Sequence, residues 1–158
     1  MEEASPENLA ELEKRHQTTV IIFAAQILLA FVLTLVALFI TPSAENSLST
    51  ETLRTLWIVI IFIAVGTTVL RRFFLSWERL RDIALLKGIQ GLLRTLQTNA
   101  IILSVLTESV VIVGFLVTFL SGDKYEILRA GLVALILFAI NFPRKKVWEN
   151  IVSGLQEN

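Results

Sequence analysis

The chain has 158 residues, of which 54% are hydrophobic and 18% are charged, and its formal net charge is zero. A mean hydropathy of +0.71 excludes an ordinary water-soluble globular domain and indicates a protein whose surroundings are lipid. The absence of cysteine excludes a disulfide framework and a thiolate metal site. The one histidine, His16, stands among charged residues before the first apolar run, which is typical of a surface or interfacial position.

Four apolar runs are long enough to cross a bilayer, whose hydrocarbon core takes about 20 residues of α-helix. We expect spans at about 18–41, 53–75, 99–121 and 126–143. The fourth run is the shortest, and Arg129 near its start must extend its side chain towards the headgroups. The predicted fold class is all-α, a polytopic membrane protein with four transmembrane helices in a domain that covers 17–143.

The basic residues predict how these spans are oriented. Lysine and arginine total 14, and all but Arg54, Lys124 and Arg129 lie within residues 1–16, 71–94 and 144–146. The positive-inside rule therefore predicts a cytoplasmic N-terminal segment (1–16), a cytoplasmic C-terminal tail (144–158) and a place in the cell (inner) membrane. We expect anionic lipid headgroups, and no nucleic acid, at the basic residues that border the spans: Arg71, Arg72, Arg144, Lys145 and Lys146.

The central cytoplasmic segment, about 76–96, is amphipathic. Trp77, Leu80 and Ile83 recur at helical spacing between charged positions, and Gly88 and Gly91 predict a turn. Two arrangements fit this pattern: the second and third spans continue into the cytoplasm as a helical hairpin, or a short helix lies in the membrane interface with Trp77 as its anchor. The interfacial helix is favoured, because the helical segment from Arg72 to the turn is longer than the segment from the turn to Asn99, and the two halves of a hairpin would match in length.

A weak internal repeat favours two helical hairpins of the same orientation. "QTTVII" at 17–22 resembles "QTNAII" at 97–102, and "RRFFLSWE" at 71–78 resembles "RKKVWE" at 144–149. Duplication is one interpretation. The other is that basic residues followed by tryptophan are what any cytoplasmic interface selects.

Small and polar residues inside the membrane form two stripes at helical spacing. The third span has Ser104, Thr107, Glu108, Val111, Gly114, Thr118 and Ser121, and the first has Thr19, Gln26, Ala30, Thr34 and Ala37. Such residues let helices approach closely and form hydrogen bonds across their interface, so we expect both stripes to face protein. The helix-packing positions predicted within the spans are Ala30, Gly66, Gly114 and Thr118.

Glu108 is the main candidate for a functional residue, because no cation in the spans lies at its depth. An ionised carboxylate at the bilayer centre costs about 2.5–3.5 kcal/mol on insertion scales, so the protonated acid is the cheaper state. Gln26 lies at a similar depth and is the predicted hydrogen-bond partner. Glu108, Gln26, Thr107 and Ser104 are therefore candidates for an ion-binding or proton-binding site, and the alternative is that a protonated Glu108 only specifies packing.

The segment "LQTNAIILSVLTESVVIVG" at 96–114 resembles the carboxylate-bearing helix of the proteolipid c subunit of rotary ATP synthases. Gln97, Thr98, Thr107, Glu108 and Gly114 stand at the spacings of that helix. The resemblance implies that Glu108 carries the ion and that the chain is similar to the larger, duplicated members of the family. It covers 19 residues, and the preceding span has the single Gly66 where the family has a repeated glycine pattern.

The sequence has no phosphate-cradling Gly-Lys-Ser/Thr loop, no zinc-protease motif, no hydrolase nucleophile elbow and no intramembrane histidine for haem. We therefore expect no enzyme activity, no cofactor and no bound metal. The predicted function is that of a small accessory or structural membrane protein, which forms a homo-oligomer or joins a membrane-protein partner. The alternative is a component that translocates protons or cations through Glu108.

Overall fold

The computed structural model describes residues 6–40 and 49–156. Within these ranges the chain forms five α-helices and no strand: α1 (Pro6–Ile40), α2 (Thr50–Phe74), α3 (Trp77–Ser121), α4 (Tyr125–Asn141) and α5 (Lys145–Gln156). Four helical stretches are long and apolar enough to cross a membrane. The predicted fold class, an all-α polytopic membrane protein with four spans, is confirmed. The outermost residues of both predicted terminal segments (1–5 and 157–158) lie outside the described ranges.

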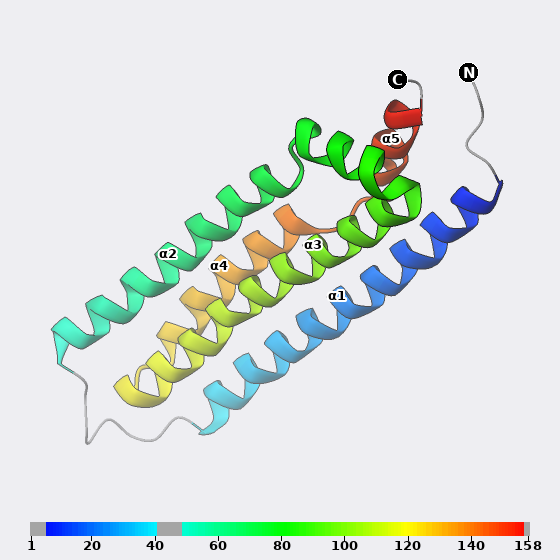
Figure 1. Ribbon diagram of the computed structural model, residues 1–158. Coiled ribbons are helices and arrows are strands. Elements are labelled where there is room, and N and C mark those ends of the chain that lie inside the picture. The colour runs from blue at the N-terminus through cyan, green and yellow to red at the C-terminus, as the bar shows by residue number, and fades with distance from the viewer. Residues whose placement is uncertain (1–5, 41–48, 157–158) are drawn as a thin grey trace.

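α3 is the central helix of the bundle. It contacts each of the other four helices, whereas α1 and α2 make no contact with each other in the described ranges. Figure 1 shows α1 and α2 on opposite sides of the pair formed by α3 and α4. The first two helices therefore do not pack as a hairpin, although α3 and α4 do, and the possible sequence repeat does not extend to the packing.

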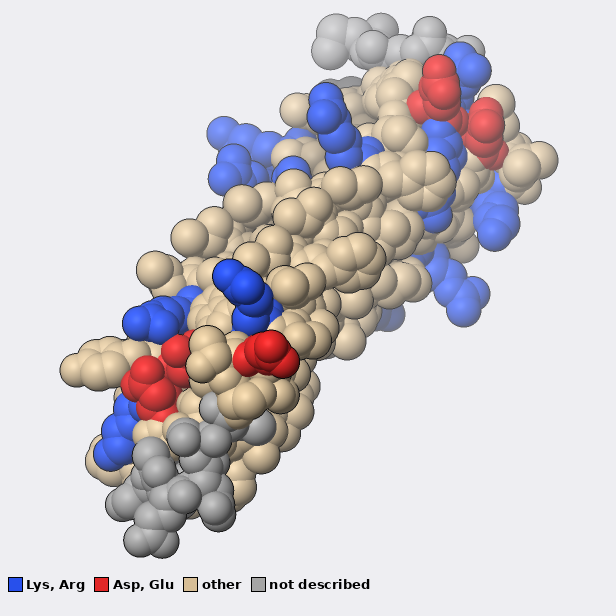
Figure 2. Space-filling model, turned by 90° about the vertical axis from the view of Figure 1, so that its left-hand side faces the viewer, with Lys and Arg blue, Asp and Glu red and all other residues tan. Residues whose placement is uncertain are grey.

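Apolar side chains fill the bundle and also cover its outside. Phe23, Ile60, Val110 and Phe138 are among the buried core residues, while many large residues such as Phe62 are exposed. Charged side chains gather towards the two ends of the molecule (Figure 2). This distribution fits helices whose outer faces contact lipid, because apolar surface carries no cost in hydrocarbon.

Gly88 interrupts α3 between the central segment and the third span. Its φ of 66° and ψ of −178° lie in a region that side chains with a Cβ rarely adopt, so glycine suits this turn. The structure therefore has a separate short helix before Gly88, and the residues after it continue the third span. Trp77, the predicted interfacial anchor, packs its ring against Gly154 of α5 and stays partly exposed.

The end of the bundle that carries α5 has a second apolar core, and we call this region the terminal cap. It comprises the first turns of α1, the short helix before Gly88, the start of the third span and α5, with buried residues Leu12, Leu80, Leu92, Leu93, Leu96, Trp148, Ile151 and Val152. The predicted tail 144–158 is thus largely a packed helix. His16 of α1 secures it by donating a hydrogen bond from Nε2 to the carbonyl oxygen of Pro143 at 2.9 Å.

Candidate functional site

Glu108 lies inside the bundle, with 8% of its surface exposed. On the surface of α3, Glu108 lies between Val105, three residues before it, and Ile112, four residues after it, and both of these side chains are about half exposed. Within the described residues no hydrogen bond or ion pair reaches its carboxyl group. The carboxyl group therefore lies at the edge of the buried face of α3 and has no charged partner among the described residues.

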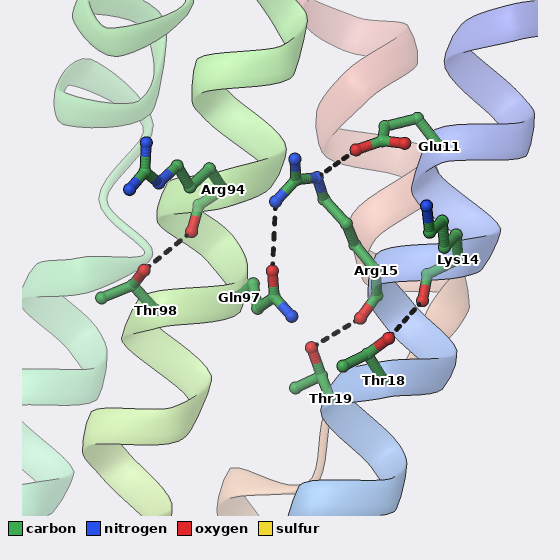
Figure 3. Close-up of polar contacts among 8 residues, drawn as sticks. All are labelled: Glu11, Lys14, Arg15, Thr18, Thr19, Arg94, Gln97 and Thr98. Carbon is green, nitrogen blue, oxygen red and sulfur yellow. Dashed lines mark hydrogen bonds and ion pairs between the residues drawn. The ribbon is translucent and has the colours of Figure 1, made fainter.

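A contact between α1 and α3 defines the register of these two helices. The Arg15 Nε donates to the Glu11 carboxylate at 2.6 Å, and its Nη1 donates to the Gln97 amide oxygen at 3.2 Å (Figure 3). Arg15 and Gln97 are separated by 82 positions, and Gln26 and Glu108 have the same separation. Both lie eleven positions further along, which is about three helical turns. The register thus places Gln26 level with Glu108.

The hydrogen bond predicted between these two residues is not formed. The Gln26 Oε1 atom is buried and has no hydrogen-bond partner in the part of the chain that the structure describes. The register brings the two residues to the same level along the bundle, but equal depth does not bring their polar atoms together. A buried acceptor without a donor destabilises the folded protein, because its lost hydrogen bonds to water are not replaced.

Thr107 and Ser104, the other predicted site residues, are fully buried but bond to their own helix. Thr107 donates from Oγ1 to the carbonyl oxygen of Leu103 at 2.8 Å, and Ser104 donates from Oγ to that of Ile101 at 2.9 Å. The Thr107 Oγ1 also accepts a hydrogen bond from Asn141 Nδ2 of α4 at 3.4 Å. The described structure thus contains no hydrogen bond from either hydroxyl to Glu108.

The predicted packing residues divide into two groups. Ala30, Gly114 and Thr118 are buried, and a Cβ at Gly114 would overlap the Cβ of Ala130 on α4. Thr118 Oγ1 has no hydrogen-bond partner in the described chain. Gly66 departs from the prediction, because it is exposed and a Cβ there would meet nothing within 4 Å. α2 approaches the bundle through another face, which buries residues such as Thr67.

A polar cluster at the opposite end from the terminal cap was not predicted. The indole N–H of Trp57 donates to Glu126 Oε2 at 2.5 Å, and Arg129 Nη1 donates to Glu126 Oε1 at 2.9 Å. Glu126 is only 6% exposed, so the bond from Trp57 joins α2 to α4 in a sheltered position, while the pair of Arg129 and Glu126 lies within α4. Spacing of three residues could have signalled the pair of Glu126 and Arg129, but no local pattern points to Trp57.

Two asparagines at the end of the bundle next to the terminal cap were also not predicted as site residues. Asn99 of α3 and Asn141 of α4 are each 5% exposed, and both line a cavity of about 310 Å³. The Nδ2 of Asn99 and the Oδ1 of Asn141 have no hydrogen-bond partner among residues 6–40 and 49–156. Both asparagines lie near the ends of predicted spans, and this position is the only feature of the sequence that could have pointed to them.

The described residues contain no group of three or more His, Cys, Asp or Glu side chains that could hold a metal ion. The site contains a titratable carboxyl group on α3 and, at the same level on α1, an unpaired amide oxygen, together with a separate cavity nearer the terminal cap. No protein-family model, curated protein sequence or solved structure matches this chain.

Proposed function

We propose that this chain is a small non-enzymatic membrane protein with an accessory or structural role, in which Glu108 belongs to the packing of the bundle. The observation that supports this role is the burial of the α3 stripe inside the chain itself. Ser104, Thr107 and Thr118 are fully buried, and Gly114 is closed against Ala130. Apolar cavities on the outside of α4 have linings that do not include Glu108.

Glu108 has a structural task in this account. Gln26 Oε1 is a buried acceptor without a donor, and the register of α1 and α3 puts it level with the carboxyl group. A protonated Glu108 supplies the O–H that this acceptor lacks, after a change of rotamer. The pair then links the two helices inside the apolar bundle, where an unpaired polar atom is costly.

Glu108→Gln tests this role in vesicles that contain the purified protein and a pH-sensitive dye, alongside thermal unfolding in detergent. We expect no protein-dependent proton flux from either the wild type or the variant, and a nearly unchanged stability in Glu108→Gln, because the glutamine amide keeps a hydrogen-bond donor. Glu108→Leu removes the donor and should lower the stability by about 1–3 kcal/mol. Thr118→Val is the matched control on the same helix, because it removes a buried hydroxyl that has no partner. Proton flux that is present in the wild type and lost only in Glu108→Gln contradicts the structural role.

Proton or cation translocation through Glu108 is the second candidate function. One observation favours it: Asn141 lines the polar cavity and also donates to Thr107, the residue next to Glu108. Polar groups therefore extend from the terminal end of the bundle to within one residue of the carboxyl group. The flux measurement above separates the two functions, because translocation requires flux that depends on Glu108.

The outer face of α2 is the surface through which we propose that the protein associates with a second copy or with another membrane protein. The predicted α3 stripe is occupied within the chain, whereas Gly66 on α2 is open and Phe62 beside it is exposed. A small residue on an outer face lets another helix approach closely. The chain has no cysteine of its own, so a single introduced cysteine reports on one position. Phe62→Cys should form a disulfide-linked dimer in membranes, while Ile112→Cys on α3 should not. Equal cross-linking of both variants contradicts a specific α2 interface.

The orientation with both termini in the cytoplasm, in the cell (inner) membrane, belongs to the same proposal. It is supported by the placement of α5 and the start of α1 at the same end of the bundle (Figure 1), and by the excess of basic residues there. Ser153→Cys, an exposed position on α5, should react with a membrane-impermeant thiol reagent only after the cells are opened. Labelling of intact cells contradicts the orientation.

A further inference from the structure

The cavity at the terminal end of the bundle has the size and position of a ligand site. It has a volume of about 310 Å³, roughly ten times the ~30 Å³ that one water molecule occupies in the liquid. The ends of α2 and α4, the middle of α3 and the first turn of α5 enclose it. It therefore lies between helices at the level where the spans meet the terminal cap.

The charge of the cavity is positive. Arg71 at the end of α2 and Arg144 just before α5 line it, and its lining includes no carboxylate. Neither guanidinium has an ion-pair partner among the described residues, in contrast to Lys145, which pairs with Glu13 and Glu149. Arginine binds phosphate through two parallel N–H groups, so two unpaired arginines at one cavity favour an anionic phosphate ligand.

Inside the cavity two buried asparagines add hydrogen-bonding groups that the protein itself leaves unused. Asn99 contributes a free Nδ2 donor and Asn141 a free Oδ1 acceptor, on side chains that are 95% buried. Buried polar atoms of this kind are almost always paired with protein, water or ligand. A phosphate oxygen in the cavity would accept from the Asn99 Nδ2 once that amide rotates towards it, because both unpaired atoms now lie behind the accessible lining.

The first turn of α5 adds a favourable dipole. Pro143, Arg144 and Trp148 line the cavity, and α5 begins at Lys145. The N-terminus of a helix presents backbone N–H groups and a partial positive charge, and both favour a phosphate. This feature points to the same ligand class as the arginines and Asn99.

The remaining lining is apolar and includes Leu103, Ile140 and Phe142. We propose that the cavity binds the headgroup of one anionic phospholipid, with its phosphate at Arg71 and Arg144 and its acyl chains leaving along the apolar side. Basic pockets between transmembrane helices are where such headgroups bind. The site is separate from Glu108 and does not depend on the proposed structural role.

The test uses the full chain purified in a neutral detergent, with native mass spectrometry to count retained lipids. Phosphatidylglycerol is the anionic probe, phosphatidylcholine carries the same phosphate without net charge, and sn-glycerol 3-phosphate is the soluble counterpart. We expect one phosphatidylglycerol per protein, at least about tenfold preferred over phosphatidylcholine. Arg71→Gln with Arg144→Gln should lower its affinity about 25-fold, which is about fivefold for each basic residue near an anionic headgroup.

The matched control is Arg72→Gln with Lys146→Gln, which removes the same charge from exposed positions outside the cavity lining. An equal loss in this control overturns the site in favour of general surface attraction. Glycerol 3-phosphate that binds as tightly as the lipid overturns the lipid as ligand. Asn99→Leu keeps the charge of the cavity and should still weaken the retention of phosphatidylglycerol about tenfold, with an unchanged helical circular dichroism spectrum. Unaltered retention of phosphatidylglycerol in this variant overturns the proposal, even where the arginine variant fails to fold.

Discussion

Gly114 provides the most direct test of how α3 packs against α4. A methyl group at this position would overlap the Cβ of Ala130, whereas the same group at Gly66 would meet nothing within 4 Å. Both changes to alanine carry the same gain in helix propensity of up to about 1 kcal/mol. Overpacking costs about 1–3 kcal/mol, so Gly114→Ala should be less stable than Gly66→Ala by that amount.

Thermal unfolding in detergent, followed by circular dichroism, measures this difference. A shift of about 3 °C per kcal/mol for a chain of this size corresponds to a midpoint about 3–9 °C lower for Gly114→Ala than for Gly66→Ala. Combining Gly114→Ala with Ala130→Gly moves one methyl group across the interface and should recover most of the loss. The reasoning is refuted if the two single variants have the same midpoint, or if Ala130→Gly brings no recovery.

Two further predictions concern contacts outside the α3 stripe. The Lys145 ammonium group holds the pKa of the Glu13 carboxyl below its ordinary value, and Glu13 raises the pKa of Lys145. The pair therefore stabilises the folded protein fully between about pH 4.3 and 10.4. This stabilisation is lost as the pH falls through the lowered pKa of Glu13 or rises through the raised pKa of Lys145. Lys145→Gln should remove this pH dependence from the unfolding midpoint, and an unchanged pH profile in the variant contradicts the prediction. Trp57→Phe removes the N–H group that donates to Glu126 and should lower the free energy of unfolding by about 1.5–3 kcal/mol. Trp77→Phe, at a partly exposed tryptophan, should lower it by less. Equal unfolding midpoints for the two variants contradict a stabilising buried bond at Trp57.

The fold was predictable because length and hydropathy suffice to identify helices that cross a bilayer. The turn at Gly88 was also accessible, since glycine adopts its backbone angles easily. The packing of α5 was not, because a short amphipathic segment after a span fits a membrane surface as well as a protein core. Only the tertiary structure distinguishes the two, through the burial of Trp148 and Val152.

The site was only partly predictable, because a stripe of small and polar residues indicates which face of a span is buried but not which atoms meet across it. Gly66 and Gly114 each follow a valine within an apolar span, yet only Gly114 meets another helix. Counting residues along two parallel spans brought Gln26 level with Glu108, but counting does not show whether the two polar groups meet, and the described structure has no hydrogen bond between them. The cavity lined by Asn99 and by residues of three other helices depends on contacts that no local pattern encodes.

The central claim is that the α3 stripe around Glu108 is packed within the chain and closed to water. The accessibility of a single cysteine tests it most directly, because the chain has none of its own. Ser104→Cys keeps the size of a fully buried side chain one turn before Glu108, and Ser153→Cys is exposed on α5. The account predicts that a small water-soluble thiol reagent modifies Ser153→Cys and leaves Ser104→Cys unmodified in membranes opened on both sides; comparable rates at the two positions would contradict it.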